Sequence, residues 1–175
     1  MREKTANVII LAKMAIMVAL ICVCSWVTIP FGSIPFTLQT FGIAMALGTL
    51  GGKRGTAVIA TYLLFGAVGL PVFSSFGSGI GVLLGPTGGY LIGFLIGGIV
   101  YLLIEHWMKG SRSSKYIGIA AFMLTYYVFG SIHFSIVGGI PFWSAVTAAV
   151  LPYIVPDVLK SALAITIGDR IARYI

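Results

Sequence analysis

Long apolar runs, each almost free of charge, follow one another along this chain. Hydrophobic residues make up 59% of its 175 positions and charged residues only 9%, whereas an ordinary soluble domain carries roughly 25% charged residues. So few charges cannot cover a surface that faces water, and disorder requires the opposite composition, with low hydrophobicity and high net charge. Because a membrane-spanning helix takes about 20 mostly apolar residues, the sequence predicts an integral membrane protein.

The apolar runs divide into six predicted transmembrane helices that leave no room for a soluble domain. A helix with a short loop takes roughly 25–30 residues, so about six of them fill the chain. We therefore expect a single all-α transmembrane domain over residues 1–175, with no built-in ATPase, nuclease or dinucleotide-binding domain. The predicted helices cover approximately residues 8–29, 36–50, 56–70, 87–107, 116–137 and 143–174.

Two segments of the sequence depart from the pattern of plain helices and polar turns. The segment 71–85 is uncharged and rich in Gly and Ser, but it is too apolar for an ordinary exposed loop. Irregular backbone is tolerated at membrane depth only where protein buries it or where it lines a cavity. We expect this segment to dip into the bundle and cap an outward-facing pocket. In the last predicted helix, Pro152 and Pro156 each lack a backbone donor, which predicts a kink or an interruption.

Lysine and arginine fall almost entirely on one side of the predicted bundle. With six alternating helices, ten of the eleven lie at the termini and in the two loops on their side, and the loops near 30–36, 71–86 and 138–142 contain none. This distribution follows the positive-inside rule. We therefore expect a multi-pass protein of the cell membrane with both termini cytoplasmic, whose net charge of +7 reflects topology and not nucleic-acid binding. The ten residues are Arg2, Lys4, Lys13, Lys53, Arg54, Lys109, Arg112, Lys115, Arg170 and Arg173.

Asp157 and Lys160 differ from the other charged residues because they fall inside the last predicted span. Counting back from Arg170 at about 1.5 Å per residue places Lys160 roughly 15 Å and Asp157 roughly 20 Å from the cytoplasmic edge. A charge in mid-membrane costs at least about 2.5–3.5 kcal/mol on insertion scales and usually marks a functional site. Their i,i+3 spacing allows them to pair, so we expect them to anchor a buried pocket. In the structural alternative, Asp157 complements a helix N-terminus next to Pro156 and Lys160 neutralises it.

Other polar side chains gather in the outer half of the predicted bundle. Together with the Gly-rich segment 71–85 they predict a ligand that binds from outside. For Tyr90, Trp143 and Tyr153 the alternative is an interfacial aromatic belt, and for His133 it is a hydrogen bond between helices. The candidate pocket residues are Thr37, Gln39, Ser74, Ser75, Ser78, Thr87, Tyr90 and His133.

The sequence carries no catalytic or metal-binding motif. It has no Gly-Lys-Ser/Thr phosphate loop, no HExxH and no CxxC pattern, and Cys22 and Cys24 would point to nearly opposite faces of a helix. We therefore expect no catalysis, no metal and no cofactor. Two other classes stay open: a membrane enzyme that uses Asp157 and His133, and a structural protein in which Asp157 and Lys160 only tie helices together.

The first apolar run carries a small-residue pattern. We expect this run to be a retained helix and not a cleaved signal peptide, because no small-residue cleavage site ends it. Ala15 and Ala19 form a small-x-x-x-small unit, which lets helices approach closely in lipid. This face predicts either docking of another membrane subunit or packing within the bundle itself.

Five sequence blocks, taken together, closely resemble the BioY family, the biotin-specific substrate-binding (S) components of energy-coupling factor (ECF) transporters. The resemblance runs from about residue 8 to the end of the chain, with the blocks in the family's order. The blocks are Pro-Phe-Thr-Leu-Gln-Thr at 35–40, Leu-Gly-Gly-Lys-Arg-Gly at 50–55, Gly-Ala-Val-Gly-Leu-Pro-Val-Phe at 66–73, Leu-Gly-Pro-Thr-Gly-Gly-Tyr-Leu-Ile-Gly-Phe at 84–94 and Pro-Asp-Val-Leu-Lys at 156–160.

The resemblance implies a six-helix S-component bundle that holds biotin near the outer face under its loops. It implies partners as well: a transmembrane coupling subunit (T component) and two ABC ATPases that supply the energy for biotin uptake. The family's Pro-Asp-x-x-Lys pair, which is associated with ligand binding, maps onto Asp157 and Lys160. The family's docking face on the first helix maps onto Ala15 and Ala19. An S component for another small vitamin is the alternative within this class.

The chemistry of biotin fits these residues. Its ureido ring has two N–H donors and a carbonyl acceptor, its thioether ring is apolar and its tail is acidic. Asp157 could accept a ureido N–H, and Lys160 could keep Asp157 ionised or reach an acceptor on the ligand. We expect Gln39 and the Ser and Thr hydroxyls to complete the polar contacts. Phe73, Phe76 and Tyr90 would enclose the apolar rings.

Overall fold

The computed structural model describes residues 2–30, 32 and 34–171, and most of them belong to helices. Their two short strands pair antiparallel, with Thr28 opposite Thr37 and Ile29 opposite Phe36. In chain order the elements are α1 (Arg2–Trp26), β1 (Thr28–Ile29), β2 (Phe36–Thr37), α2 (Gln39–Ala67), the 3₁₀ turn η1 (Ser74–Phe76), α3 (Ile80–Leu84), α4 (Gly88–Trp107), α5 (Arg112–Gly138), α6 (Phe142–Ala149) and α7 (Leu151–Ile171).

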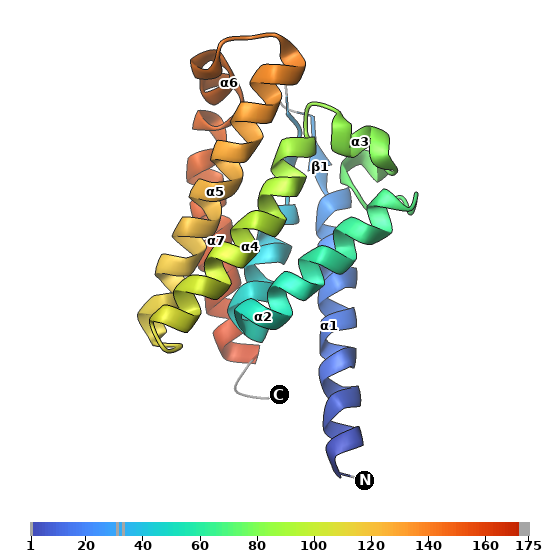
Figure 1. Ribbon diagram of the computed structural model, residues 1–175, viewed down its shortest axis with the longest axis vertical. Helices are drawn as coiled ribbons and strands as arrows, with labels where there is room; N and C mark the ends of the chain where they lie inside the picture. The colour runs from blue at the N-terminus through green and yellow to red at the C-terminus, as the bar shows by residue number, and fades with distance from the viewer. Residues whose placement is uncertain (1, 31, 33, 172–175) are drawn as a thin grey trace.

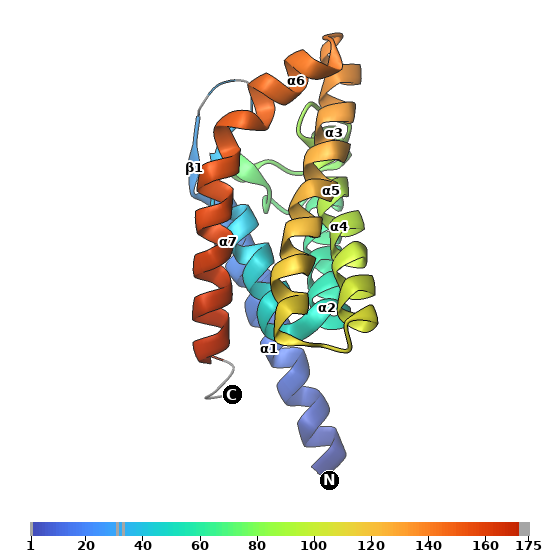
Figure 2. The same cartoon turned by 90° about the vertical axis from the view of Figure 1, so that its left-hand side faces the viewer.

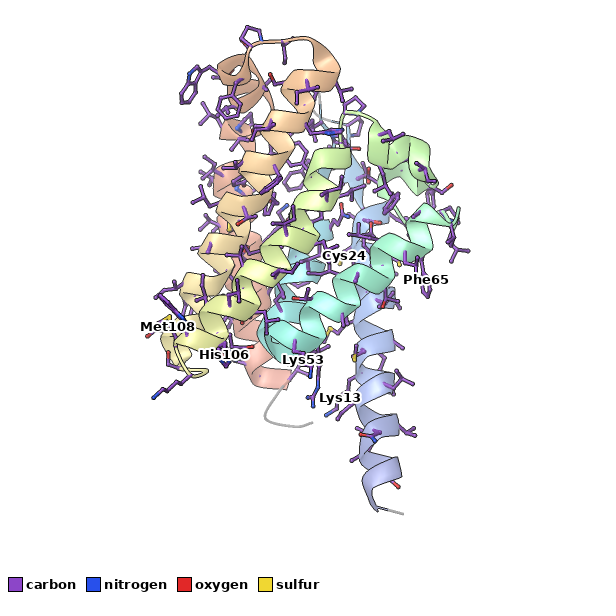
Figure 3. The ribbon with its side chains drawn as sticks, viewed as in Figure 1. Lys13, Cys24, Lys53, Phe65, His106 and Met108 are labelled. Carbon is purple, nitrogen blue, oxygen red and sulfur yellow. The ribbon has the colours of Figure 1, made fainter. Side chains whose placement is uncertain are left out.

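The helices form an elongated bundle whose connections gather at two opposite ends (Figures 1 and 2). α4 packs along α5, and α2 lies against α1, α4 and α7. One end, here called the hairpin end, holds the β1–β2 hairpin, α3 and α6. The other, here called the basic end, holds the start of α1, the α4–α5 connection and the end of α7, and Figure 3 places Lys13 and Lys53 toward it.

Four helices within the described ranges are long and apolar enough to cross a membrane, namely Thr5–Trp26, Gly88–Trp107, Ser113–Gly138 and Leu151–Ile171. They also turn large apolar side chains outward: Val23, Leu103, Leu124 and Leu163 are all more than half exposed. A soluble protein does not expose apolar side chains over its whole surface, whereas a protein surrounded by lipid does. The structure is therefore that of a multi-pass membrane protein, and the count of six spans stays a prediction.

The second and third predicted helices are joined in one element, α2, which reverses direction at Gly51 (φ 78°, ψ 171°). The polar turn expected over residues 51–55 is therefore almost absent, because the helix resumes at Gly52. Only glycine adopts the Gly51 conformation readily. Gly52 packs so closely that a Cβ there would lie 2.6 Å from Leu102 Cα. The Gly52 N–H donates to Glu105 Oε2 at 2.7 Å, which gives the new helix start an acceptor.

The last predicted helix, 143–174, is divided into α6 and α7 by Val150 (φ −126°, ψ −55°). The interruption precedes both prolines. Pro152 then stands in the first turn of α7, where its missing N–H is not needed, and α7 continues through Pro156. Residues 172–174 of that predicted helix lie outside the described residues, as does Arg173 of the basic set.

α1 packs on the bundle with one face only. The buried face includes Met17, Val18, Ile21 and Ser25. Ala15 and Ala19 lie on the exposed side, so this small-residue pair is not packed within the bundle. The start of α1 extends past the other helices at the basic end (Figure 1).

Candidate functional site

A cavity opens between the β1–β2 hairpin, the segment around η1 and helices α2, α4, α5 and α7. The cavity and its mouth, with the open solvent at the mouth included, hold about 600 Å³ of empty space. Nine apolar or aromatic side chains and seven polar ones line it, and such a mixture suits a small-molecule site. The lining residues are Ile34, Pro35, Thr37, Gln39, Thr40, Ser74, Thr87, Tyr90, Leu91, Phe94, Tyr126, Tyr127, Ala149, Tyr153, Asp157 and Lys160.

Asp157 and Lys160 pair in the α7 wall of this cavity. Lys160 Nζ lies 2.5 Å from Asp157 Oδ1, and the two side chains are 10% and 6% exposed. Asp157 lies well inside α7, whose first turn has no acidic residue, so the helix-terminus alternative does not describe it. Since these two are the charged residues of the lining, the wall carries a buried ion pair without net charge.

The Asp157 carboxylate accepts hydrogen bonds from four donors on three helices. Oδ1 accepts from Lys160 and, at 3.1 Å, from the Thr40 hydroxyl. Oδ2 accepts from the Tyr126 and Tyr127 hydroxyls, each at 2.7 Å. A carboxylate offers about four lone-pair positions, so these donors occupy the set. A ligand N–H reaches Asp157 only by replacing one of them, and the Thr40 contact is the longest.

Lys160 also holds the β1–β2 hairpin against α7. Its Nζ donates to the Thr37 carbonyl at 2.8 Å and lies 4.3 Å from the centroid of the Phe36 ring. The Phe36 ring stacks on Tyr153 with 6.3 Å between centroids, and the Tyr153 hydroxyl donates to the Ile34 carbonyl. One wall of the cavity is thus fastened to α7 by the residues that line it.

Gln39 is fastened from behind the cavity. It is 6% exposed, and its Nε2 donates to the Tyr62 hydroxyl at 2.8 Å. Tyr62 in turn donates to the Val72 carbonyl at 3.0 Å. Ser25 of α1 donates to the same carbonyl. These bonds connect the start of α2 with the segment 71–85.

Eight residues were expected to bind the ligand most directly: Gln39, Phe73, Ser75, Ser78, Thr87, Tyr90, Asp157 and Lys160. The structure brings five of them to the cavity, namely Gln39, Thr87, Tyr90, Asp157 and Lys160. The other three, Phe73, Ser75 and Ser78, lie outside the lining. Phe73 is buried behind it, against Gly66 and edge-on to Tyr62 at 5.6 Å. Ser75 and Ser78 are exposed, because the turn at η1 directs Ser74 alone of these serines to the cavity.

Tyr126, Tyr127 and Thr40 are the polar lining residues that sequence reasoning missed. Both tyrosines lie near the middle of the predicted helix 116–137, where a hydroxyl has no water and needs a protein partner. Their depth in the predicted span was the feature of the sequence that could have identified them. Leu91 and Phe94, which are apolar lining residues, have no such feature, because they resemble every other residue of an apolar helix.

Two further candidates, His133 and Trp143, lie outside the cavity. His133 Nε2 is 3.1 Å from the Gly85 carbonyl and does not line the cavity. It therefore joins α5 to the chain before α4. Trp143 is 74% exposed. Tyr153, by contrast, is part of the lining. Within the described ranges, no three His, Cys, Asp or Glu side chains gather as metal ligands would.

Comparison with known sequences gives consistent matches along the chain. The sequence model of the BioY family matches residues 1–175. A relative described as biotin transporter BioY from Thermotoga maritima is 37% identical over 172 residues, which covers 93% of this chain and 95% of the relative. A probable biotin transporter BioY from Pyrococcus horikoshii is 37% identical over 157 residues and covers 90% of this chain and 92% of its own.

Comparison with solved structures gives the same fold. The crystal structure of the S-component for biotin from an ECF-type ABC transporter superimposes with a TM-score of 0.86 at 28% sequence identity. The match covers 97% of this chain and 93% of the other. The helical bundle described above is therefore the S-component fold.

Proposed function

Because the chain belongs to the BioY family, we propose that it is the substrate-binding membrane subunit that captures biotin from outside the cell and delivers it for uptake. The family is one of transporter subunits and not of enzymes. The observation that carries the proposal for this chain is the buried Asp157–Lys160 pair in the wall of the cavity at the hairpin end.

The donors and acceptors of the cavity fit those of biotin. In the proposed complex a ureido N–H takes the place of the Thr40 hydroxyl on Asp157, where the existing contact is the longest at 3.1 Å. Lys160 pairs with the carboxylate and is the positive charge in the cavity wall for an acceptor of the ligand. The rings of Tyr90, Phe94 and Tyr126 supply apolar surface for the thioether ring.

The partners follow from the class of transporter. The structural relative is the S-component of an ECF-type ABC transporter, and this chain has no phosphate loop of its own. We therefore propose that two ABC ATPases supply the energy for uptake and that a T component couples them to this chain. Ala15 and Ala19 on the exposed side of α1 offer the small-residue face on which such a membrane subunit docks.

The orientation follows from the charges. The basic end, with Lys13 and Lys53, belongs in the cytoplasm, and the hairpin end with its cavity belongs outside the cell membrane. Biotin would then enter from outside between the hairpin and the segment 71–85.

Binding in detergent tests the proposal directly. We would measure retained mass by native mass spectrometry and thermal stability for the purified chain with biotin, desthiobiotin and thiamine. A ligand at a hundredfold excess over Kd stabilises by about 2.7 kcal/mol. Stabilisation by biotin, none by thiamine, and loss of the effect in Asp157→Asn and Lys160→Ala supports the assignment. Stabilisation by thiamine alone supports an S component for another vitamin, and no response to any of them leaves the pair a structural tie.

A further inference from the structure

Gln39 is one of the polar side chains that reach the cavity, and its orientation is set by a residue that does not. Tyr62 is fully buried and absent from the lining. Its hydroxyl lies between Gln39 Nε2, at 2.8 Å, and the Val72 carbonyl, at 3.0 Å. The bonds form a short relay from the segment 71–85 through α2 to the cavity.

The direction of the protons in this relay follows from the groups themselves. A backbone carbonyl only accepts, so the single hydroxyl proton of Tyr62 is directed to Val72. The Tyr62 oxygen is then an acceptor, and the part of Gln39 that faces it must be the NH₂ group. The rotated amide would place its oxygen against the Tyr62 oxygen, with one proton for two acceptors.

Gln39 Oε1 is left free by this arrangement. Among the described residues it has no hydrogen-bond partner, yet it is not sealed from solvent, and the side chain lines the cavity. Asp157, the stronger acceptor, already has four donors around it. A neutral oxygen held in one orientation is therefore an acceptor that the cavity offers without displacing a protein donor.

We propose that Tyr62 is a positioning residue for ligand recognition, which locks the Gln39 amide so that Oε1 accepts an N–H of the ligand. This rests on the proposed function and deepens it, since the second ureido N–H of biotin is the donor that such an oxygen fits. Phe73 supports the relay, because its ring packs edge-on to Tyr62 at 5.6 Å. The segment 71–85 thereby sets ligand specificity from behind the cavity.

The test is the biotin affinity of Tyr62→Phe, measured by titration calorimetry on the whole chain in detergent. Phenylalanine keeps the packing and removes only the hydroxyl. Without it the amide can rotate and oppose the ligand N–H with its own NH₂, so we expect Kd to rise about tenfold, as for the loss of one hydrogen bond. An analogue of biotin with oxygen in place of the matching ring N–H should bind the variant more tightly than the wild type, because the freed amide can turn its NH₂ group toward that oxygen.

A double-mutant cycle separates positioning from general structure. In a Gln39→Ala background, Tyr62→Phe should change Kd less than twofold, because the amide that it orients is gone. One control completes the set. Tyr101→Phe removes an equally buried hydroxyl that has no hydrogen-bond partner among the described residues. It should bind biotin within twofold of the wild type.

The outcomes are distinct. Wild-type affinity in Tyr62→Phe, or an equal loss in Tyr101→Phe, overturns the relay, and so does full additivity of Tyr62→Phe with Gln39→Ala. If the wild-type chain itself does not bind biotin, the proposed function fails instead, and this is seen before any variant is made.

Discussion

At Asp157 a single carboxylate accepts from a lysine, a threonine and two tyrosines inside an apolar bundle. A charge removed from water is tolerated only when it is paired and its remaining lone pairs are satisfied. Both conditions are met here before any ligand arrives. The site is therefore preorganised, and little free energy is lost on binding to order its polar groups.

Removal of Lys160 alone should damage both the fold and the site. Lys160→Ala leaves the buried Asp157 carboxylate without its cation, and breaking a buried pair in this way typically costs about 3–5 kcal/mol. We expect a lower free energy of unfolding in detergent and no measurable biotin binding. The double variant Asp157→Asn/Lys160→Met should regain most of the stability, because no charge is left unpaired, but not the binding.

Lys115 provides the matched control for that prediction. It pairs with Asp169 at 2.6 Å, but these side chains are 30% and 28% exposed. Such partly exposed pairs contribute about 0–1 kcal/mol, so Lys115→Ala should leave both stability and binding near the wild type. Equal losses in Lys115→Ala and Lys160→Ala would contradict a special role for the buried pair.

Thr40→Val tests which donor the ligand replaces on Asp157. The variant removes the 3.1 Å hydroxyl contact and opens one lone pair for a ureido N–H. We expect biotin affinity to be unchanged or a few-fold tighter, measured by titration calorimetry. Tyr126→Phe, which removes a 2.7 Å contact to the other oxygen, should weaken it. A loss of more than about tenfold in Thr40→Val would show that Thr40 itself holds the ligand.

Residue-level prediction from the sequence succeeded where membrane depth makes a side chain conspicuous. Asp157 and Lys160 could be selected because charges are costly in the middle of a span. Tyr126 and Tyr127 also lie deep in a predicted span, but depth alone does not tell which way each ring points, so their place in the cavity wall could not be predicted. Phe73 was predicted wrongly to line the cavity, because it lies in the Gly- and Ser-rich segment 71–85. Its ring packs tightly against Gly66 and so lies behind the cavity wall.

At the scale of the elements, apolar runs located the helices but not how they join. The sequence 51–55 reads as a polar turn, yet the structure needs only Gly51 to reverse α2. The reason is tertiary, since Glu105 of α4 supplies the acceptor for the Gly52 N–H. The prolines did predict an interruption, and the break falls at Val150, just before Pro152. Pro156 does not end α7, which continues through it.

Gly51→Ala should destabilise the chain without touching the cavity. At φ 78° and ψ 171° an alanine is held in a region that side chains avoid, at a cost of about 1–3 kcal/mol. We expect a lower midpoint of thermal unfolding and unchanged biotin affinity in the folded fraction. Gly81→Ala is the control, since nothing lies within 4 Å of its added Cβ, and it should unfold like the wild type.

For the whole molecule, the positions of the charges and of the exposed residues suggest the orientation in the membrane and the face that binds a partner subunit. Basic residues collect at one end and the cavity opens at the other, so the ligand and the energy source are expected on opposite sides of the membrane. α1 extends beyond the other helices at the basic end and keeps its small residues uncovered. A partner subunit could therefore bind α1 without disturbing the cavity.

The double substitution Ala15→Leu/Ala19→Leu should separate biotin binding from transport. Leucine at both positions fills the groove that close helix approach requires, while the cavity, formed by other elements, stays intact. We expect wild-type biotin affinity in detergent, but loss of co-purification with co-expressed T component and ATPases and loss of ATP-dependent biotin uptake into vesicles. Ala162→Leu, at an exposed position of α7, is the matched control and should assemble and transport normally. If the double variant assembles as well as this control, the docking face lies elsewhere on the bundle; if it loses biotin binding too, α1 is part of the site and the separation between binding and docking does not hold.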